Sequence, residues 1–469
     1  MTQPIDIPVS KIEILKSELP KNCWTQDIDI IAPHLTEWRD KYFGKTPLML
    51  TPRCTQDVSD AVKLCAEHRI SIMPQGGNTG LVGGNTPMGE VLITLKHMTR
   101  IREINTTANS LIVEAGAVLQ NVLDAADAEN RKFPMTLSSQ GSCTVGGVLS
   151  TNAGGNHVLK YGTTKELVFG VEAVLPNGDI FNGLTNLRKD NTGYDLNRLF
   201  LGAEGTLGII TAASLKLFPK PKYVQRALIG LDSVEAAISL LEDFRAGGRL
   251  AMFEVMPAIG YHAVIDGFDS IRDPFDTSYA WYLLCDWEVE SEAEGMTLAE
   301  NILGKAFEAK KVLDAVIAQN ETQAADILSI REHMSAGQKF LGGSVKHDIT
   351  VPIDKIPEFF RLADAKMQEV VPGCRPVGFG HFGDGNIHYN IAQPEGADKK
   401  EFLANWDALS QPIFDICDAL GGSISAEHGI GTMKFDDLAQ RASPTKYALL
   451  KAIKRAIDPE RIMNPRVMV

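Results

Sequence analysis

The sequence has little cysteine, and none at the spacing that metal clusters use. Its 469 residues include seven cysteines, an odd number without any Cys-x-x-Cys pair. Iron–sulfur centres are normally held by cysteines at short, regular spacing, so we expect no such centre here. Widely spread cysteines are typical of reduced thiols, and we therefore expect a cytoplasmic protein.

Positively charged residues are also fewer than negatively charged ones. Lys and Arg number 46 against 59 Asp and Glu, which gives a net charge of −13. An acidic surface repels phosphate backbones unless it carries a local basic stripe, and the sequence has none. We therefore expect neither nucleic acid nor an anionic membrane as a partner.

Apolar runs that could span a membrane are missing as well. One long uncharged run, residues 133–159, is rich in Gly, Ser, Thr and Asn, whose polar groups are too costly in hydrocarbon. The first twenty residues contain Asp6, Glu13 and Glu18 and lack the basic and apolar regions of a signal peptide. We expect no integral membrane segment and no targeting peptide.

What is present is the composition of a folded, soluble chain, with 44% hydrophobic and 22% charged residues. At about 100–200 residues per domain, the length indicates roughly two to four domains. Apolar periodicity and turn residues predict helices over 55–68, 234–246, 292–307, 323–341 and 445–457, and strands over 91–95, 110–117, 167–179, 226–231 and 279–286. The strand over 167–179 ends in an Asn177-Gly178 turn.

Three glycine-rich segments, residues 74–89, 141–155 and 201–221, stand in the first half of the chain. Glycine allows close backbone approach, so several N–H groups can converge on an anion. Three such segments together predict a large phosphate-bearing ligand, with ordinary turns as the alternative. No P-loop pattern occurs, and the GxGxxG at 378–383 precedes a turn and a strand, which excludes a Rossmann motif.

A second pattern predicts a metal site. Asp384-Gly385 is typical of a type I′ hairpin turn. If it forms a two-residue loop, His381 pairs with His388, with Cβ atoms about 4.5–5.5 Å apart, and Asn390 shares their face. Two imidazoles at that spacing can hold one metal ion, and the alternative is a solvated hairpin.

A third ligand is expected from the segment SISAEHGIGTMK, where Glu427 stands beside His428. Neighbours on an extended chain point to opposite sides. One of the two could bind the metal while the other faces a different part of the site.

These segments carry a family resemblance. PQGGNTGLVGG, GSCTVGGVLSTNAGG and GAEGTLGIIT resemble the flavin-binding signatures of the vanillyl-alcohol oxidase / p-cresol methylhydroxylase superfamily. HxGDGNxHxN and SAEHGxG resemble its D-2-hydroxy-acid dehydrogenase branch, and the D-2-hydroxyglutarate dehydrogenase group in particular.

The resemblance implies an α+β fold with a two-subdomain FAD-binding domain and an α+β substrate domain that contains an antiparallel sheet. The predicted parts are an N-terminal segment over 1–45, the FAD-binding domain over 46–221, the substrate (cap) domain over 222–421, and a mostly helical C-terminal segment over 422–469 that returns to the flavin.

The resemblance also implies non-covalent FAD, because Asn78 and Thr79 stand where covalent members usually carry His or Cys. The expected FAD contacts are Pro74, Gly76, Gly77, Asn78, Thr79, Gly80, Leu81, Gly141, Ser142, Thr144, Gly147, Asn152, Gly155, Glu204, Ile209 and Asn464.

By position in the family motifs, His381, His388 and Glu427 match the ligands of a divalent metal, normally zinc. His428 matches the catalytic base, and Asn390 matches a residue near substrate and flavin.

Three further residues match the group that binds the distal carboxylate of a dicarboxylate. Arg331 and Ser335 stand four apart on a predicted helix, and Lys346 lies on a predicted strand. Arg offers a bidentate fork, Ser a donor and Lys a point charge. The alternative is that these are solvated surface residues.

The resemblance implies oxidation of D-2-hydroxyglutarate to 2-oxoglutarate, with the C2 hydride passing to flavin N5. D-malate or D-lactate dehydrogenase activity stays open, as do a metal-dependent hydrolase and a non-catalytic flavin-binding subunit. Without a nicotinamide fingerprint or cluster cysteines, an electron-transfer protein or a quinone is the expected acceptor. A homodimer is left open, because the wider family is often dimeric.

Overall fold

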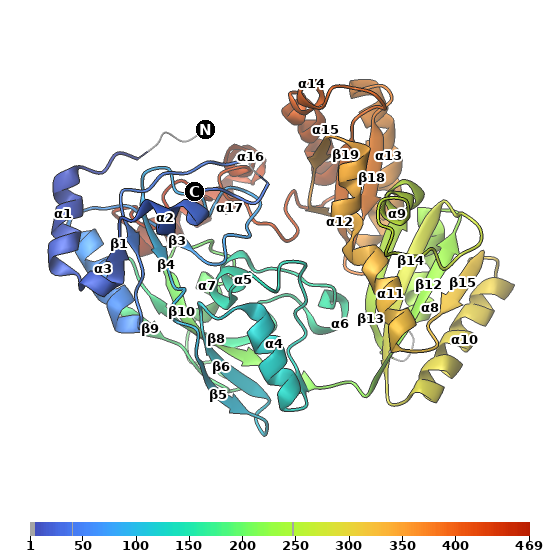
Figure 1. Cartoon of the computed structure of the whole chain (residues 1–469), viewed down its shortest axis with the longest axis horizontal. Helices are drawn as coiled ribbons and strands as arrows, with labels where there is room; N and C mark the ends of the chain where they lie inside the picture. Colours follow the sequence, from blue (N-terminus) through green and yellow to red (C-terminus); the bar gives the residue numbers. More distant parts are fainter. Residues whose placement is uncertain (1–4, 40, 246–247) are drawn as a thin grey trace. The chain divides into compact units, whose positions relative to one another are not determined.

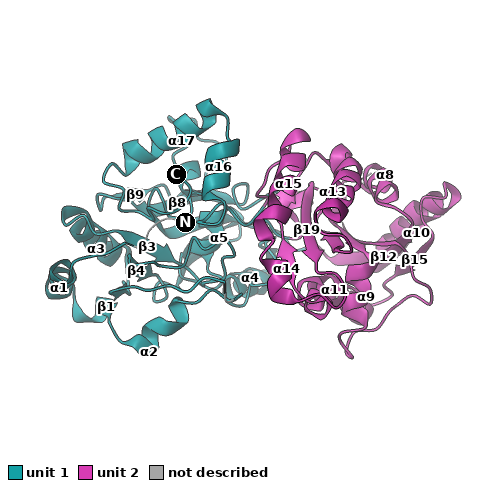
Figure 2. Cartoon of the chain, turned by 90° about the horizontal axis from the view of Figure 1, so that it is seen from above, with its two compact units in different colours: residues 1–155, 162–220, 427–469 teal, residues 156–161, 221–426 magenta. Residues whose placement is uncertain are grey.

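A computed structural model describes residues 5–39, 41–245 and 248–469, which form two compact units (Figures 1 and 2). Unit 1 comprises residues 1–155, 162–220 and 427–469, and unit 2 comprises residues 156–161 and 221–426. Within the described ranges, no helix combines the length and the apolar character needed to cross a bilayer.

Unit 1 combines short helices with two main sheets, as the predicted α+β class requires. One sheet has the order β1-β2-β4-β3, and the other is antiparallel with the order β5-β6-β10-β8-β9. Its helices and helical turns are α1 (Val9–Glu18), η1 (Lys21–Cys23), α2 (Ile28–Ile31), η2 (Ala32–His34), α3 (Thr55–Glu67), α4 (Leu119–Ala128), α5 (Val145–Thr151), α7 (Asn197–Phe200), α16 (Phe435–Arg441) and α17 (Pro444–Ile457). Its strands are β1 (Trp24–Thr25), β2 (Met49–Leu50), β3 (Ile72–Gln75), β4 (Val91–Thr94), β5 (Ile101–Asn105), β6 (Ser110–Glu114), β7 (Arg131–Lys132), β8 (Val168–Val174), β9 (Ile180–Asn182), β10 (Ile209–Lys216) and β11 (Phe218–Pro219).

The strand pattern in unit 1 follows from burial. β10 lies in the middle of its sheet and is buried along almost its whole length, whereas β5 lies at an edge and is only partly buried. The predicted Asn177-Gly178 turn is confirmed. It joins β8 to β9, and Gly178 has a φ of +86°, which favours glycine.

The end of the chain completes the first sheet of unit 1. Met463 forms a parallel bridge with Ile72, and the N–H of Asn464 donates to the Ile72 oxygen at 2.8 Å. Ile72 begins β3, the strand that leads into the first glycine-rich segment. The last residues therefore support the start of that segment.

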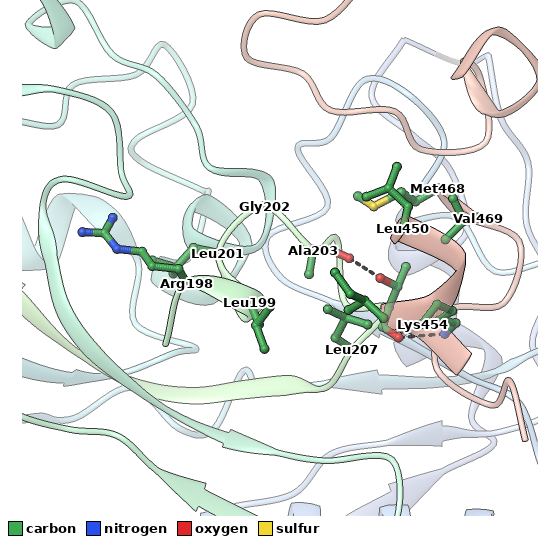
Figure 3. Close-up of a pocket in the computed structure, with 12 residues that line it drawn as sticks. Arg198, Leu199, Leu201, Gly202, Ala203, Leu207, Leu450, Lys454, Met468 and Val469 are labelled. Carbon is green, nitrogen blue, oxygen red and sulfur yellow. Dashed lines mark hydrogen bonds between the residues drawn. The ribbon is translucent and has the colours of Figure 1, made fainter. Parts of the chain in front are cut away.

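Helix α17 is tied to this region by a buried lysine and borders a small cavity (Figure 3). Lys454 Nζ donates to the backbone oxygens of Thr206 and Met463 at 2.7 Å each, and to Asp458 Oδ2 at 2.5 Å. The cavity has a volume of about 180 Å³ and a mostly aliphatic lining that contains none of the predicted site residues.

Unit 2 is built on an antiparallel sheet of order β13-β14-β12-β15 and a smaller sheet around β19. Its helices and helical turns are α6 (Val158–Tyr161), α8 (Val234–Arg245), α9 (Ala258–Ile265), α10 (Glu292–Glu308), α11 (Glu321–Glu332), α12 (Met334–Gly337), η3 (Gln338–Leu341), η4 (Ile353–Lys355), α13 (Ile356–Val370), α14 (Lys399–Leu403) and α15 (Trp406–Ala419). Its strands are β12 (Tyr223–Leu231), β13 (Leu250–Pro257), β14 (Trp281–Val289), β15 (Asp314–Ile317), β16 (Ser344–Lys346), β17 (Ile349–Thr350), β18 (Arg375–Phe379) and β19 (Asn386–Ala392).

Both faces of the larger sheet are covered. Successive β12 residues point to opposite faces, so Ile229 joins one hydrophobic cluster with α8 and α10, while Leu228 joins another with α9 and α11. The two sheets are joined where Val255 of β13 pairs with Gly380 through two N–H···O bonds of 3.0 Å.

The single helix predicted over 323–341 is wrong in its continuity. α11 ends at Glu332, and α12 and the 3-10 turn η3 follow as separate short elements. The break falls at His333, whose Nδ1 lies 2.8 Å from the Ser329 oxygen. The His333 ring shares this carbonyl with the His333 N–H, which donates to it at 3.0 Å, and the next residue begins the separate short helix α12.

Candidate functional site

The first glycine-rich segment is an irregular loop after β3 whose shape is fixed by Asn78. Asn78 has a φ of +55°, and its Nδ2 donates to the Thr36 oxygen at 2.9 Å. Its Oδ1 accepts from Asn85 Nδ2 at 2.7 Å. The Asn78 side chain therefore holds the loop in shape, and a contact of this residue with FAD stays a prediction.

The first two glycine-rich segments pack directly against each other. A Cβ atom on Gly77 would lie 2.0 Å from the Ser142 oxygen, and one on Gly76 would lie 2.5 Å from Thr144 Oγ1. Thr144 Oγ1 is buried and has no hydrogen-bond partner among the described residues. A buried hydroxyl between glycines fits a ligand with phosphate oxygens, because such an oxygen would accept a hydrogen bond from it.

The second segment is not wholly a loop. It contains helix α5, which ends at Asn152 in the left-handed conformation, with a φ of +50°. Asn152 Oδ1 accepts from the Lys165 N–H at 2.9 Å. Gly155 follows, and a Cβ atom there would lie 2.8 Å from the Thr136 oxygen, so this turn also needs glycine.

The third segment contains Glu204, and strand β10 begins within this segment at Ile209. The Glu204 carboxylate accepts from the N–H groups of Ile430 and Gly431 at 2.7 Å each. Burial raises the pKa of Glu204. Asn464 Nδ2 donates to the backbone carbonyl oxygen of Glu204 at 2.8 Å. Glu204 and Asn464 thus fix the loop that follows His428, and their predicted FAD contacts remain untested.

In unit 2, the predicted hairpin register is wrong. Phe379, not His381, lies opposite His388 in the β18–β19 ladder. The connection is the six-residue loop 380–385 rather than Asp384-Gly385 alone. Gly380 has a φ of +148°, and a Cβ atom there would lie 2.8 Å from the Asn386 oxygen, so the bend starts at this glycine.

The two imidazoles nevertheless lie side by side. The ring centroids of His381 and His388 are 5.4 Å apart, and each ring has a nitrogen within 4.8 Å of one in the other. The side chain of His381 is 8% exposed and that of His388 16% exposed. Their closeness comes from the fold of the loop and not from pairing in the ladder.

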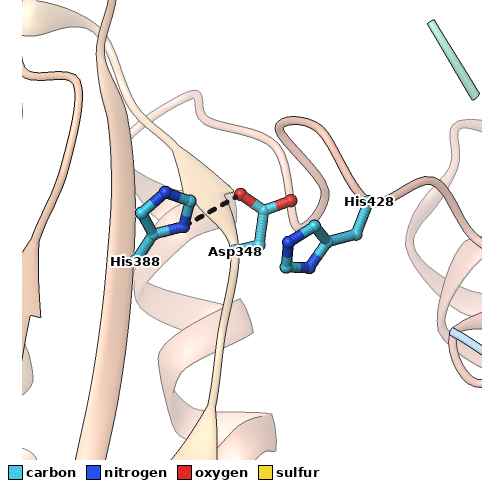
Figure 4. A group of neighbouring side chains, drawn as sticks. All are labelled: Asp348, His388 and His428. Atoms are coloured by element: carbon cyan, nitrogen blue, oxygen red, sulfur yellow. Dashed lines mark ion pairs between the residues drawn. The ribbon is translucent and has the colours of Figure 1, made fainter. Parts of the chain in front are cut away.

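A buried carboxylate faces the Nδ1 atom of each ring. Glu254 Oε1 bonds to Nδ1 of His381, and Asp348 Oδ1 lies 3.6 Å from Nδ1 of His388 (Figure 4). Metal-binding histidines commonly place their second ring nitrogen against a carboxylate in this way. The arrangement presents the Nε2 atoms as the nitrogens that a metal would use, so the two histidines fit a divalent metal.

Strand pairing fixes the positions of both carboxylates. The Val255–Gly380 bridge places Glu254 directly across from His381. The pairs Lys346–Asn390 and Ile349–Ile387 follow a single register, which places Asp348 across from His388.

Neither carboxylate was predicted from the sequence. Glu254 is the one charged residue in the apolar strand LAMFEVMP, and this isolated charge was the available signal. Asp348 stands between His347 and Ile349 in a segment that mixes polar and apolar residues, so it offered no comparable signal.

Glu254 also binds the predicted carboxylate anchor. Arg331 Nε donates to Glu254 Oε2 at 2.7 Å. Burial alone would raise the pKa of Glu254, but Arg331 and His381 hold it at about 2. Glu254 is therefore a buried anion bonded to two predicted site residues.

Other predicted substrate residues lie on the same face of the smaller sheet. Lys346 pairs with Asn390, whose Nδ2 donates to Gln338 Oε1 at 2.8 Å. The Arg331 guanidinium lies 5.0 Å from the centre of the Phe379 ring, and the His388 ring lies 5.1 Å from the same ring. The structure thus groups these residues on one face.

Ser335 differs from the prediction. It lies in α12 and not on the helix of Arg331, and it is exposed. Its predicted role with the distal carboxylate stays a prediction.

Glu427 and His428 open the last segment of unit 1. Within that unit, Glu427 Oε1 would lie 2.6 Å from a Cβ atom on Gly154, so the carboxylate packs against the second glycine-rich segment. The residue before Glu427 is Ala426, whose N–H donates to the backbone carbonyl oxygen of Asp348 at 3.3 Å in unit 2. The chain itself therefore keeps Glu427 one peptide bond from a residue that contacts Asp348.

Comparisons with known proteins define the class. Residues 220–468 match the family described as FAD linked oxidases, C-terminal domain, and residues 46–183 match the FAD binding domain family. The chain is similar to p-cresol methylhydroxylase, with a TM-score of 0.76 and 18% identity over 98% of this chain and 96% of that one. The predicted fold class is confirmed by this likeness.

Among curated relatives, it is 36% identical to the mitochondrial D-2-hydroxyglutarate dehydrogenase of Arabidopsis thaliana, over 97% of this chain and 80% of that protein. It is 32% identical to the D-2-hydroxyglutarate dehydrogenase of Stutzerimonas stutzeri strain A1501, over 97% of both chains. The chain therefore belongs to the family of FAD-linked oxidases, and it is a flavin-dependent oxidoreductase.

Proposed function

We propose that this protein oxidises D-2-hydroxyglutarate to 2-oxoglutarate with FAD and a divalent metal, most simply zinc. The relatives named for this activity span nearly the whole chain. The observation that carries the metal part is the pair of carboxylates, Glu254 and Asp348, on the Nδ1 atoms of His381 and His388. This arrangement supports both histidines as metal ligands.

Glu427 is the proposed third protein ligand. Two histidines and one glutamate form a common catalytic zinc set, and such a set keeps a position open for substrate. When bound, FAD supplies the hydride acceptor, and the metal supplies a charge that favours the ionised hydroxyl of the substrate.

The remaining chemistry falls to side chains of this chain. His428 accepts the hydroxyl proton, because an imidazole titrates near working pH. Arg331 and Lys346 bind the distal carboxylate and so fix the direction of the C2–H bond. Asn390, on the face of Lys346, adds a polar contact near the substrate.

D-malate and D-lactate remain the alternative substrates with the same chemistry. Two cations on one face favour a dicarboxylate, because its second carboxylate can form charge-assisted hydrogen bonds that a monocarboxylate such as lactate cannot form. We propose that the electrons leave to an electron-transfer protein or a quinone.

The test is an anaerobic titration of the FAD-containing protein followed by visible absorbance. D-2-hydroxyglutarate is expected to bleach the oxidised flavin, D-lactate to do so far less efficiently, and L-2-hydroxyglutarate not at all. Removal of zinc with a chelator is expected to stop the bleaching while the yellow colour remains. Full reduction by D-2-hydroxyglutarate in zinc-free protein would refute the metal part, and no reduction by any of these acids would refute the substrate class.

A further inference from the structure

We propose that Glu254 is a positioning residue that couples the metal site to the distal-carboxylate anchor, an inference that rests on the proposed function. One carboxylate holds a metal ligand, His381, with one oxygen and the anchor Arg331 with the other. Metal affinity and the preference for dicarboxylates then depend on the same side chain.

The position of Glu254 is fixed by backbone pairing. Two N–H···O bonds of 3.0 Å join Val255 to Gly380, so Glu254 and His381 are cross-strand neighbours. Glu254 is 1% exposed and lies on a strand buried along its whole length. The carboxylate is therefore held rigidly, and it can orient the imidazole that bonds to it.

The second oxygen of Glu254 sets the orientation of the guanidinium. It accepts from Nε of Arg331, which is the inner nitrogen of the side chain, so the two Nη groups form the outer fork. The guanidinium also lies over the Phe379 ring. Held by a carboxylate and a ring, the fork keeps the fixed direction that bidentate recognition of a substrate carboxylate requires.

Asp348 provides a matched control in the same unit. It faces Nδ1 of His388, as Glu254 faces Nδ1 of His381, and it is also buried. Its partners include His388 and Asn386, and its backbone oxygen accepts from the Ala426 N–H, whereas the contacts described for Arg331 are with Glu254 and Phe379. Replacing Asp348 should therefore weaken metal binding without changing recognition of the distal carboxylate by Arg331.

The experiment compares Glu254→Gln with Asp348→Asn in the full, FAD-loaded chain. Zinc affinity is measured by competition with a chromogenic chelator, which needs no turnover. Anchor function is measured as the ratio of kcat/KM for D-2-hydroxyglutarate to that for D-lactate. Glu254→Gln is expected to weaken zinc binding by about 10- to 100-fold and to lower the substrate ratio by about tenfold or more. Asp348→Asn is expected to weaken zinc binding comparably and to leave the substrate ratio within about twofold.

A Glu254→Gln protein that keeps either the zinc affinity or the substrate ratio of wild type would overturn the coupling, and so would an equal loss of the ratio in Asp348→Asn. If Glu254→Gln does not fold, Glu254→Asp decides, because it keeps the charge but shortens the reach, and both quantities should fall together. Wild-type protein that binds no zinc or oxidises neither acid would instead refute the proposed function itself.

Discussion

Replacing Arg331 with lysine separates recognition of the distal carboxylate from general damage to the fold. Lysine keeps the positive charge beside Glu254 but loses the planar fork. Alanine would be a poorer choice, because removing one partner of a buried ion pair costs about 3–5 kcal/mol of folding free energy.

The expected magnitude follows from the bonds that the fork would make. A hydrogen bond to a charged group contributes about 1.5–3 kcal/mol, and about 1.4 kcal/mol corresponds to a tenfold change. Arg331→Lys is therefore expected to lower kcat/KM for D-2-hydroxyglutarate by about 10- to 150-fold. The value for D-lactate, which has no distal carboxylate, is expected to stay within about threefold.

Arg226→Lys is the matched control. Arg226 is 11% exposed, like Arg331, and its Nε and Nη2 donate to Asp286 at 2.7 Å each. It should cost stability, seen as a lower melting temperature, without changing the ratio between the two substrates. Equal losses on both substrates in Arg331→Lys, or an equal change of ratio in Arg226→Lys, would refute the assignment of Arg331.

Two further predictions concern the catalytic base, His428, and the stability of the fold at low pH. His428→Ala should keep FAD and zinc, measured by absorbance and metal content, but lose about 100- to 10,000-fold in kcat, and a near-normal kcat would remove His428 from the role of base. Burial alone would raise the pKa of Glu172, but bonds from Thr55 and Arg102 outweigh it and lower the pKa from 4.5. Because the folded-state pKa is depressed, the stabilisation is present above pH 4.5 and is lost as pH falls through the folded value. Glu172→Gln should therefore cost about 1.5 kcal/mol in urea unfolding at pH 7 and much less in acid, and a cost that is independent of pH would contradict this account.

Local patterns were sufficient for the most strongly periodic elements. The helix predicted over 55–68 is α3, and that over 292–307 is α10, because apolar spacing acts within a few turns of chain and, in α10, Ser291 also caps the first turn. The glycine-rich segments were also found, since glycine marks close approach wherever it occurs. The turn at Asn177-Gly178 has the same local cause.

The predicted register of the hairpin was wrong for a physical reason. The Asp384-Gly385 dipeptide has a strong local preference, but Gly380 pairs with Val255 of a distant strand, and this tertiary bond starts the bend early. The same bond brings Glu254 to His381. Carboxylates supplied by strands far away in sequence cannot be assigned from local spacing, so the histidines were predicted and their partners were not.

The bridge between Ile72 and Met463 has a consequence for biosynthesis. The unit that carries the glycine-rich segments cannot complete this pairing until Met463 has been synthesised, whereas residues 221–426 of the other unit are synthesised before it. Stable capture of the nucleotide cofactor should accordingly come late in folding, after this pairing has formed.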